Sequence, residues 1–171
     1  SVSIVTYGCK VGIWLQPTGG GEKDKSIKSI EELTASGDTP GEAAIMTAYS
    51  LARNTFNENG SNRVILATDG DFNVGLTSEK ALEDLITRER QSGIYLTCLG
   101  VGMGNLKDSK LATLAKKGNG NYAYLDDLQE AEKVLVKELT QTFYAVADDV
   151  FMNLNFNQTL EKKYRLIGID K

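Results

Sequence analysis

Apolar residues along this chain follow two periods, one typical of strands and one typical of helices. Short β-branched runs predict strands at Val2–Tyr7, Val11–Gln16, Val64–Ala67, Ile94–Val101 and Tyr122–Leu125. Between these runs, apolar residues recur every three or four positions, which predicts helices around Ile27–Leu33, from Thr39, after Ser78, over Leu111–Ala115 and from Asp127. Alternating strands and helices predict an α/β domain, a doubly wound and mostly parallel sheet with helices on both faces.

The helix predicted from Thr39 begins with a capping box, because Pro40 follows the cap and Glu42 lies three residues after it. We expect it to end near Asn59-Gly60. A second capping box at Asp127 opens the last helix. The residues expected to face inward are Ala44, Ile45, Ala48, Leu51, Ala52 and Phe56 in the first helix and Leu128, Ala131, Val134, Leu135, Leu139 and Phe143 in the last.

The N-terminal strands predict a hairpin that turns at Gly8-Cys9-Lys10, followed by a loop over residues 17–21. The C-terminal segment changes to a period of two from Val150 to Phe156, which predicts a further strand. We therefore divide the chain into an α/β domain over residues 1–147 and a β extension, or the start of a second domain, over residues 148–171.

The stretch from Arg63 to Gly75 carries the candidate site. Residues Val64–Ala67 form a continuous apolar run, which predicts a strand buried on both faces. Asp69 and Asp71 follow it directly. Ligands bind at the carboxyl ends of strands in open α/β sheets, so we expect the site at this strand end.

Composition excludes several function classes. The net charge of −4 and the pI near 5.0 leave no basic footprint for nucleic acid. The chain has no histidine, which rules out imidazole as a base, nucleophile or metal ligand. Of its two cysteines, Cys98 lies in an apolar run that favours a buried free thiol. No apolar run reaches the ~18 residues of a membrane span.

Three familiar motifs fail on spacing. An EF-hand counted from Asp69 would need glycine and glutamate where Val74 and Lys80 stand. The stretch Gly100–Asn105 lacks the third glycine of a dinucleotide fingerprint, and no phosphate-binding Gly-Lys-Ser/Thr sequence occurs. Thr39 and Asp69 remain as oxygen donors at a helix start and a strand end. Such donors suit Mg²⁺, Mn²⁺ or Ca²⁺ rather than zinc.

The order of elements, with Gly37-Asp-Thr39-Pro-Gly41 opening a helix and Thr68-Asp-Gly70 ending a strand, resembles a von Willebrand factor type A domain over about the first 147 residues. The tail is similar to that of the bacterial branch, in which a β-rich extension follows. The resemblance implies a Rossmann-like fold and a non-enzymatic interaction or adhesion function. It also implies an envelope or extracytoplasmic location in bacteria.

In this family a metal-ion-dependent adhesion site uses an Asp-x-Ser-x-Ser loop, a threonine and an aspartate. The cation then takes a Glu or Asp carboxylate of a protein partner as its last ligand. The resemblance assigns Thr39 as the threonine ligand and Asp69 as the aspartate that holds the metal through water. From the loops around these two residues, we expect a site rim that consists of Asp38, Gly70, Asp71 and Asn73.

The chain departs from the family at its N-terminus, because no Asp-x-Ser-x-Ser motif occurs in it. In the family that motif ends a first strand lying between those that match Val2–Tyr7 and Val64–Ala67. We therefore expect an open slot between these two strands. An upstream polypeptide or a neighbouring chain would fill it, or a rearrangement would close it.

Two other functions stay open from the sequence. Asp69 and Asp71 could hold Mg²⁺ in a phosphoryl-transfer enzyme of doubly wound fold, although no phosphate loop or nucleophile accompanies them. The chain alone could also be a structural scaffold without an active metal site.

Overall fold

The computed structural model describes residues 1–8, 10–34, 41–68, 79–102 and 108–138, together with Phe151, Asn153 and Asn155 in the tail. Its elements run in the order β1 (Val2–Tyr7), β2 (Val11–Thr18), α1 (Lys23–Glu31), α2 (Gly41–Asn54), β3 (Asn62–Thr68), α3 (Glu79–Gln91), β4 (Ile94–Val101), α4 (Asp108–Lys117), β5 (Tyr122–Leu125) and α5 (Leu128–Glu132). A π-helical turn, Lys133–Glu138, continues α5.

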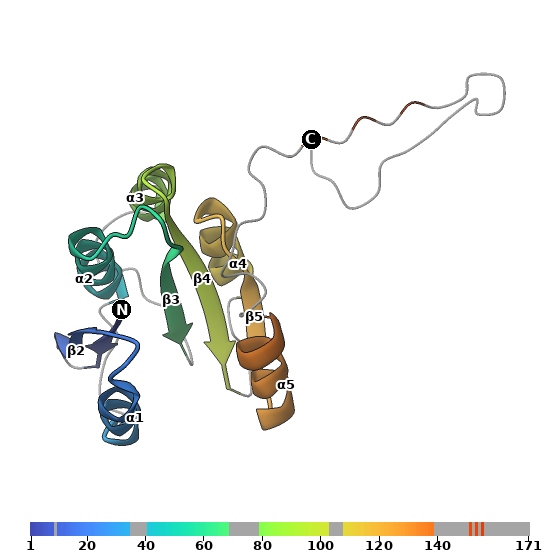
Figure 1. Ribbon diagram of the computed structural model, residues 1–171. Coiled ribbons are helices and arrows are strands. Elements are labelled where there is room, and N and C mark those ends of the chain that lie inside the picture. The colour runs from blue at the N-terminus through green and yellow to red at the C-terminus, as the bar shows by residue number, and fades with distance from the viewer. Residues whose placement is uncertain are drawn as a thin grey trace.

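The central sheet contains β3, β4 and β5 in that order, all parallel (Figure 1). The register pairs Asn62 with Ile94 and Thr68 with Gly100, so β3 and β4 lie side by side along the whole of β3. This confirms the predicted parallel α/β fold. The predicted hairpin is also confirmed, because β1 pairs antiparallel with β2 as a separate two-stranded sheet.

The main core lies between one face of the central sheet and the helices α2, α3 and α4. Alternate residues of β4 point into it, namely Ile94, Leu96 and Cys98. The helices supply the other core residues, Ile45, Tyr49, Leu82, Ile86, Leu111, Leu114 and Ala115. Most of these positions follow the predicted helical stripes.

The opposite face of the sheet is covered over β4 and β5 by α5 and the π-helical turn. Leu99, Leu125 and Val134 form this smaller cluster. Helices thus lie on both faces, as predicted. The inward stripe predicted for the last helix was wrong at Leu128, which is 86% exposed, and at Leu135, which is 42% exposed.

Strand β3 differs from its prediction. Val64, Leu66 and Thr68 are buried, but Ile65 is 42% exposed and Ala67 is also exposed. The prediction of burial on both faces was therefore wrong for this chain. Helix α5 and the π-helical turn cover the second face of the sheet over β4 and β5, and Ile65 on that face of β3 stays 42% exposed.

Some element ends also differ. Strand β2 extends through Pro17 to Thr18, which is tolerated because β2 is an edge strand. Helix α2 ends at Asn54, earlier than the predicted Asn59-Gly60. The residues around Asn57 form a turn instead, which hydrogen bonds to the side chain of Asn62 stabilise. Helix α3 ends before Gly93, whose φ of 81° suits a left-handed helix terminus.

Within the described residues, no helix is long and apolar enough to cross a membrane. Phe151, Asn153 and Asn155 are exposed and belong to no strand. The remainder of the predicted β extension lies outside the described residues.

Candidate functional site

The predicted site lies at the carboxyl edge of the central sheet. Strand β3 ends at Thr68, whose side chain is buried. Strand β4 ends beside it at Val101, since Thr68 pairs with Gly100 in the parallel register. At the end of β5, the Tyr124 hydroxyl donates a hydrogen bond to the carbonyl oxygen of Gly102. Three strand ends therefore converge at one edge, where an open α/β sheet binds ligands.

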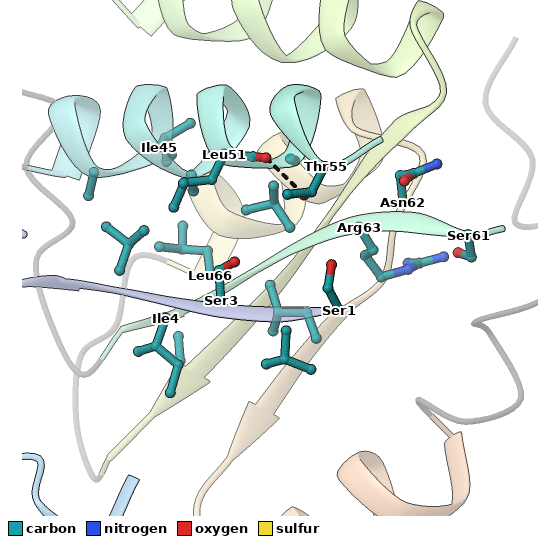
Figure 2. A pocket seen from close by; sticks show the side chains of 18 of the residues that line it. Ser1, Ser3, Ile4, Ile45, Leu51, Thr55, Ser61, Asn62, Arg63 and Leu66 are labelled. Atoms are coloured by element: carbon teal, nitrogen blue, oxygen red, sulfur yellow. Dashed lines mark hydrogen bonds between the residues drawn. The ribbon is translucent and has the colours of Figure 1, made fainter. Parts of the chain in front are cut away.

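Helix α2 runs antiparallel to β3 and so reaches the same edge. After α2 ends, the Asn57 N–H donates to Asn62 Oδ1 at 2.9 Å, and Asn62 Nδ2 donates to the Asn57 carbonyl at 2.9 Å. These bonds join the C-terminal end of α2 to the beginning of β3. Figure 2 shows this direction, with Thr55 beside Asn62 and Ile45 toward Leu66.

Helix α2 and strand β3 have similar lengths. A 14-residue helix is about 21 Å long. A strand of 7 residues is about 23 Å long. The C-terminal end of α2 is joined to the beginning of β3, and the two elements run antiparallel over similar lengths. Gly41 at the start of α2 and Thr68 at the end of β3 therefore lie at the same edge of the sheet. Thr39 precedes this helix start by two positions, and Asp69 follows this strand end directly.

The predicted ligands Thr39 and Asp69 themselves lie outside the described residues. So do the predicted rim residues Asp38, Gly70, Asp71 and Asn73. Across the described part of the chain, no group of three or more Asp, Glu, Cys or His side chains could hold a metal ion. The structure thus places the two attachment points, Gly41 and Thr68, but not the ligand atoms.

A cavity of about 730 Å³ separates β1 from β3. Residues of both strands line it, and the α2 residues Ala44, Ile45, Ala48, Leu51 and Ala52 form a third side (Figure 2). Strands β1 and β3 belong to different sheets, so they do not pair with each other. The expected open slot between them is therefore confirmed. Near its carboxyl end, the Tyr7 hydroxyl donates a hydrogen bond across to the carbonyl oxygen of Ala67.

The exposed face of β3 borders this cavity and carries one positively charged side chain, that of Arg63. Arg63 lies over the Tyr95 ring, 5.8 Å from its centroid, and its Nη1 donates to Thr97 Oγ1 at 2.8 Å. Partial burial lowers the pKa of the Arg63 guanidinium, and Tyr95 opposes that effect. The side chain stays charged, because the pKa of arginine is far above neutrality.

A buried polar cluster between α2, α3 and β4 was missed by the sequence interpretation. Glu89 has a side chain only 3% exposed and accepts a hydrogen bond from Arg53 Nη1 at 2.5 Å. Tyr49 is fully buried, and burial, followed by Glu89 and Cys98, raises the pKa of its hydroxyl. Burial also raises the pKa of the Cys98 thiol to about 12. The helical spacing could have revealed Tyr49 as a core residue, since it lies four residues after Ile45, but it does not identify Glu89.

Comparison with known proteins agrees with this architecture. The family model for the von Willebrand factor type A domain matches residues 1–140. The uncharacterized protein YfbK of Escherichia coli K12 is 40% identical over all 171 residues, which correspond to 30% of its own length. The chain therefore spans less than a third of this relative.

Solved structures share the fold at low identity. The conserved hypothetical protein BatB from Bacteroides thetaiotaomicron superposes with a TM-score of 0.62 at 19% identity, over 81% of this chain and 77% of BatB. Proximal thread matrix protein 1 from the mussel byssus, in a structure with a zinc-occupied MIDAS motif, gives a TM-score of 0.57 at 18% identity, over 78% of this chain and 34% of that protein.

Domains of the matched type generally act as interaction or adhesion modules, and they commonly bind divalent metals. The family match covers most of the chain, from the β1–β2 hairpin through the π-helical turn that follows α5. The parallel sheet, its covering helices and the low-identity structural neighbours all agree with that match. The chain belongs to the von Willebrand factor type A domain family.

Proposed function

We propose that this chain is a non-enzymatic protein-interaction module that binds a carboxylate of its partner through a divalent cation at the carboxyl edge of β3. Thr39 and Asp69 are the proposed ligands from this chain. The observation that carries the proposal is the antiparallel packing of α2 on β3, which brings Gly41 and Thr68 to one edge. This shared edge supports the proposal, because Thr39 lies two positions before Gly41 in the sequence and Asp69 follows Thr68 directly.

The donor set fits a hard cation. A threonine hydroxyl and an aspartate carboxylate offer oxygen alone, which suits Mg²⁺, Mn²⁺ or Ca²⁺. Two donors leave most of an octahedral shell open, so further ligands must come from water, the partner and another polypeptide segment. The bound cation would supply Lewis-acid attraction for a Glu or Asp side chain. Gly70, Asp71, Asn73 and Asp38 would then form the rim that the partner contacts.

Calorimetric titration with Mg²⁺ or Mn²⁺ tests this proposal in two forms of the protein. One form is the 171-residue chain, and the other is extended at its N-terminus. We expect the extended form to bind the cation and Asp69→Ala to weaken that binding by at least about tenfold, as loss of a metal-site partner commonly does. Asp84→Ala, on the exposed side of α3, is the matched control and should leave the affinity unchanged.

Two results would reject the assignment. One is an extended protein that takes up no cation. The other is an Asp69→Ala variant with the affinity of the unsubstituted protein. Turnover of a generic aryl phosphate that depends on Mg²⁺ would instead support the enzyme alternative, with Asp69 and Asp71 as its carboxylates.

A further inference from the structure

Asparagine followed by glycine occurs at two places in the chain, Asn59-Gly60 and Asn119-Gly120. Because glycine has no Cβ, its backbone nitrogen is less hindered than that of other residues. That nitrogen can attack the side-chain carbonyl carbon of the preceding asparagine and close a cyclic succinimide. Both sequences are therefore suited to deamidation, but the fold treats them differently.

Asn59 lies in the exposed loop that joins α2 to β3. Its neighbours Glu58, Gly60 and Ser61 are exposed as well. The Gly60 N–H donates to the Asn57 carbonyl at 3.1 Å, and the Asn59 N–H donates to Asn57 Oδ1 at 3.1 Å. These hydrogen bonds lie at the surface, where water replaces a partner that is lost, so opening this turn has a small free-energy cost.

Asn119 lies in the tight turn between α4 and β5 and has a φ of 51°. The Gly120 N–H donates to the carbonyl of Ala115, which is only 1% exposed, at 2.9 Å. The Gly120 backbone also lies directly against β4, because a Cβ built on it would be 1.9 Å from the Leu96 carbonyl oxygen. Leu96 in turn donates its N–H to the Gly118 carbonyl at 3.0 Å. The Gly120 nitrogen can therefore reach the Asn119 side chain only if this turn moves away from β4.

We propose that Asn59 is a site of spontaneous deamidation in the folded protein, and that the fold protects Asn119 from the same reaction. The Gly60 nitrogen loses its proton to solvent base and bonds to Asn59 Cγ. The bond from Cγ to the side-chain nitrogen breaks, and that nitrogen takes up a proton from solvent and leaves as ammonia. Water then opens the succinimide at either carbonyl, which yields aspartate or isoaspartate. The overall change consumes one water and releases one ammonia, and it does not depend on the proposed cation site.

Deamidation changes the loop in two ways. The net charge of the chain goes from −4 to −5, because one neutral amide becomes one carboxylate. Isoaspartate also adds one carbon atom to the backbone between residues 59 and 60, which lengthens the turn that Asn57 closes. Hydrogen bonds between Asn57 and Asn62 join the end of α2 to the beginning of β3. The modification therefore acts on the connection that aligns these two elements.

Mass spectrometry of tryptic peptides tests the proposal, because trypsin places the two sites in different peptides, residues 54–63 and residues 118–133. The 171-residue chain is incubated in mildly alkaline buffer, once folded and once in urea, and fragmentation follows the loss of each asparagine with time. In urea the two sites should react at similar rates, since both are then unfolded. In the folded chain Asn119 should react at least about tenfold more slowly than Asn59, which corresponds to a difference of about 1.4 kcal/mol in the free energy of opening.

Gly60→Ala is the matched control at the site itself. The added Cβ hinders the attacking nitrogen, so the variant should lose Asn59 at least about tenfold more slowly and should leave the rate at Asn119 unchanged. The three nearest atoms to this Cβ all belong to the Asn57 side chain, whose Nδ2 would lie 2.8 Å away and can move. The comparison of the two chains in urea does not require the variant to fold.

Three results would overturn the proposal. One is an Asn59 that stays intact in the folded chain while it reacts in urea. Another is an equal rate at both sites of the folded chain, which would mean that packing against β4 gives Asn119 no protection. The third is a Gly60→Ala variant that loses Asn59 as fast as the unsubstituted chain, which would mean that the reaction does not proceed through the succinimide.

Discussion

Replacing Glu89 by alanine should destabilise the protein more than removal of any exposed acidic residue on α3. The Glu89 side chain is 3% exposed, and its Oε1 lies 2.5 Å from Arg53 Nη1 and 3.5 Å from Arg88 Nη2. Breaking a fully buried ion pair costs about 3–5 kcal/mol, while an exposed pair contributes about 0–1 kcal/mol. Arg53 is 47% exposed and can rehydrate, so we expect an intermediate loss of about 2 kcal/mol for Glu89→Ala.

Urea unfolding followed by circular dichroism measures this loss, with an unchanged m-value as the sign that the denatured state is not altered. Glu83→Ala is the matched control, because Glu83 pairs with Lys117 at 3.4 Å on the wetter side of the same helix. That variant should lose less than about 1 kcal/mol. Glu89→Gln, which keeps the shape and one acceptor oxygen, should lose about half as much as Glu89→Ala.

A double-mutant cycle with Arg53→Ala isolates the pair from the packing of the side chain. We expect a coupling energy of about 1 kcal/mol or more, since the two groups are in direct contact. A coupling below about 0.3 kcal/mol would refute the argument, because it would mean that Glu89 stabilises the protein without Arg53. Equal losses for Glu83→Ala and Glu89→Ala would refute it as well.

Three other substitutions test the core. Gly120→Ala should lower the free energy of unfolding by about 3 kcal/mol or more in the same assay, because the added Cβ would lie 1.9 Å from the Leu96 carbonyl oxygen. Gly20→Ala is the control and should be near neutral, because its Cβ would meet nothing within 4 Å. Tyr49→Phe should keep or raise stability by up to about 1 kcal/mol, since within the described residues the buried hydroxyl has no hydrogen-bond partner; a loss above that size would reveal an unseen partner. Burial raises the pKa of the Cys98 thiol to about 12, so above about pH 8.5 the unfolded chain releases a proton that the folded protein keeps. The stability of the protein should therefore fall as the pH rises toward 12. Cys98→Ala should reduce that fall when thermal unfolding is measured as a function of pH.

The sequence was sufficient to predict the elements whose pattern is local. Strands β4 and β5 occur at the predicted residues, because each is a β-branched or aromatic run between clear turn residues. The N-cap predicted at Asp127 is confirmed by its side chain, which accepts the Glu130 N–H at 2.7 Å. The free, buried state of Cys98 was also predicted correctly.

The features that failed depend on what packs against an element from far away in the sequence. Ile65 and Leu66 are equally apolar, yet Leu66 is 5% exposed and Ile65 is 42% exposed, because helices cover one face of β3 and not the other. Nothing within the run itself carries that information. Glu89 was missed for the opposite reason, since an acidic residue is expected on the wet side of a helix unless its distant partner Arg53 is known.

The candidate site likewise has one part that the sequence predicts and another that it does not specify. The attachment of Thr39 and Asp69 to a helix start and a strand end came from local patterns, and the ends Gly41 and Thr68 lie at one edge as expected. The ligand roles of Thr39 and Asp69 remain predictions. A metal site gathers donors from several segments, so two positions in a sequence cannot specify the remaining ligands.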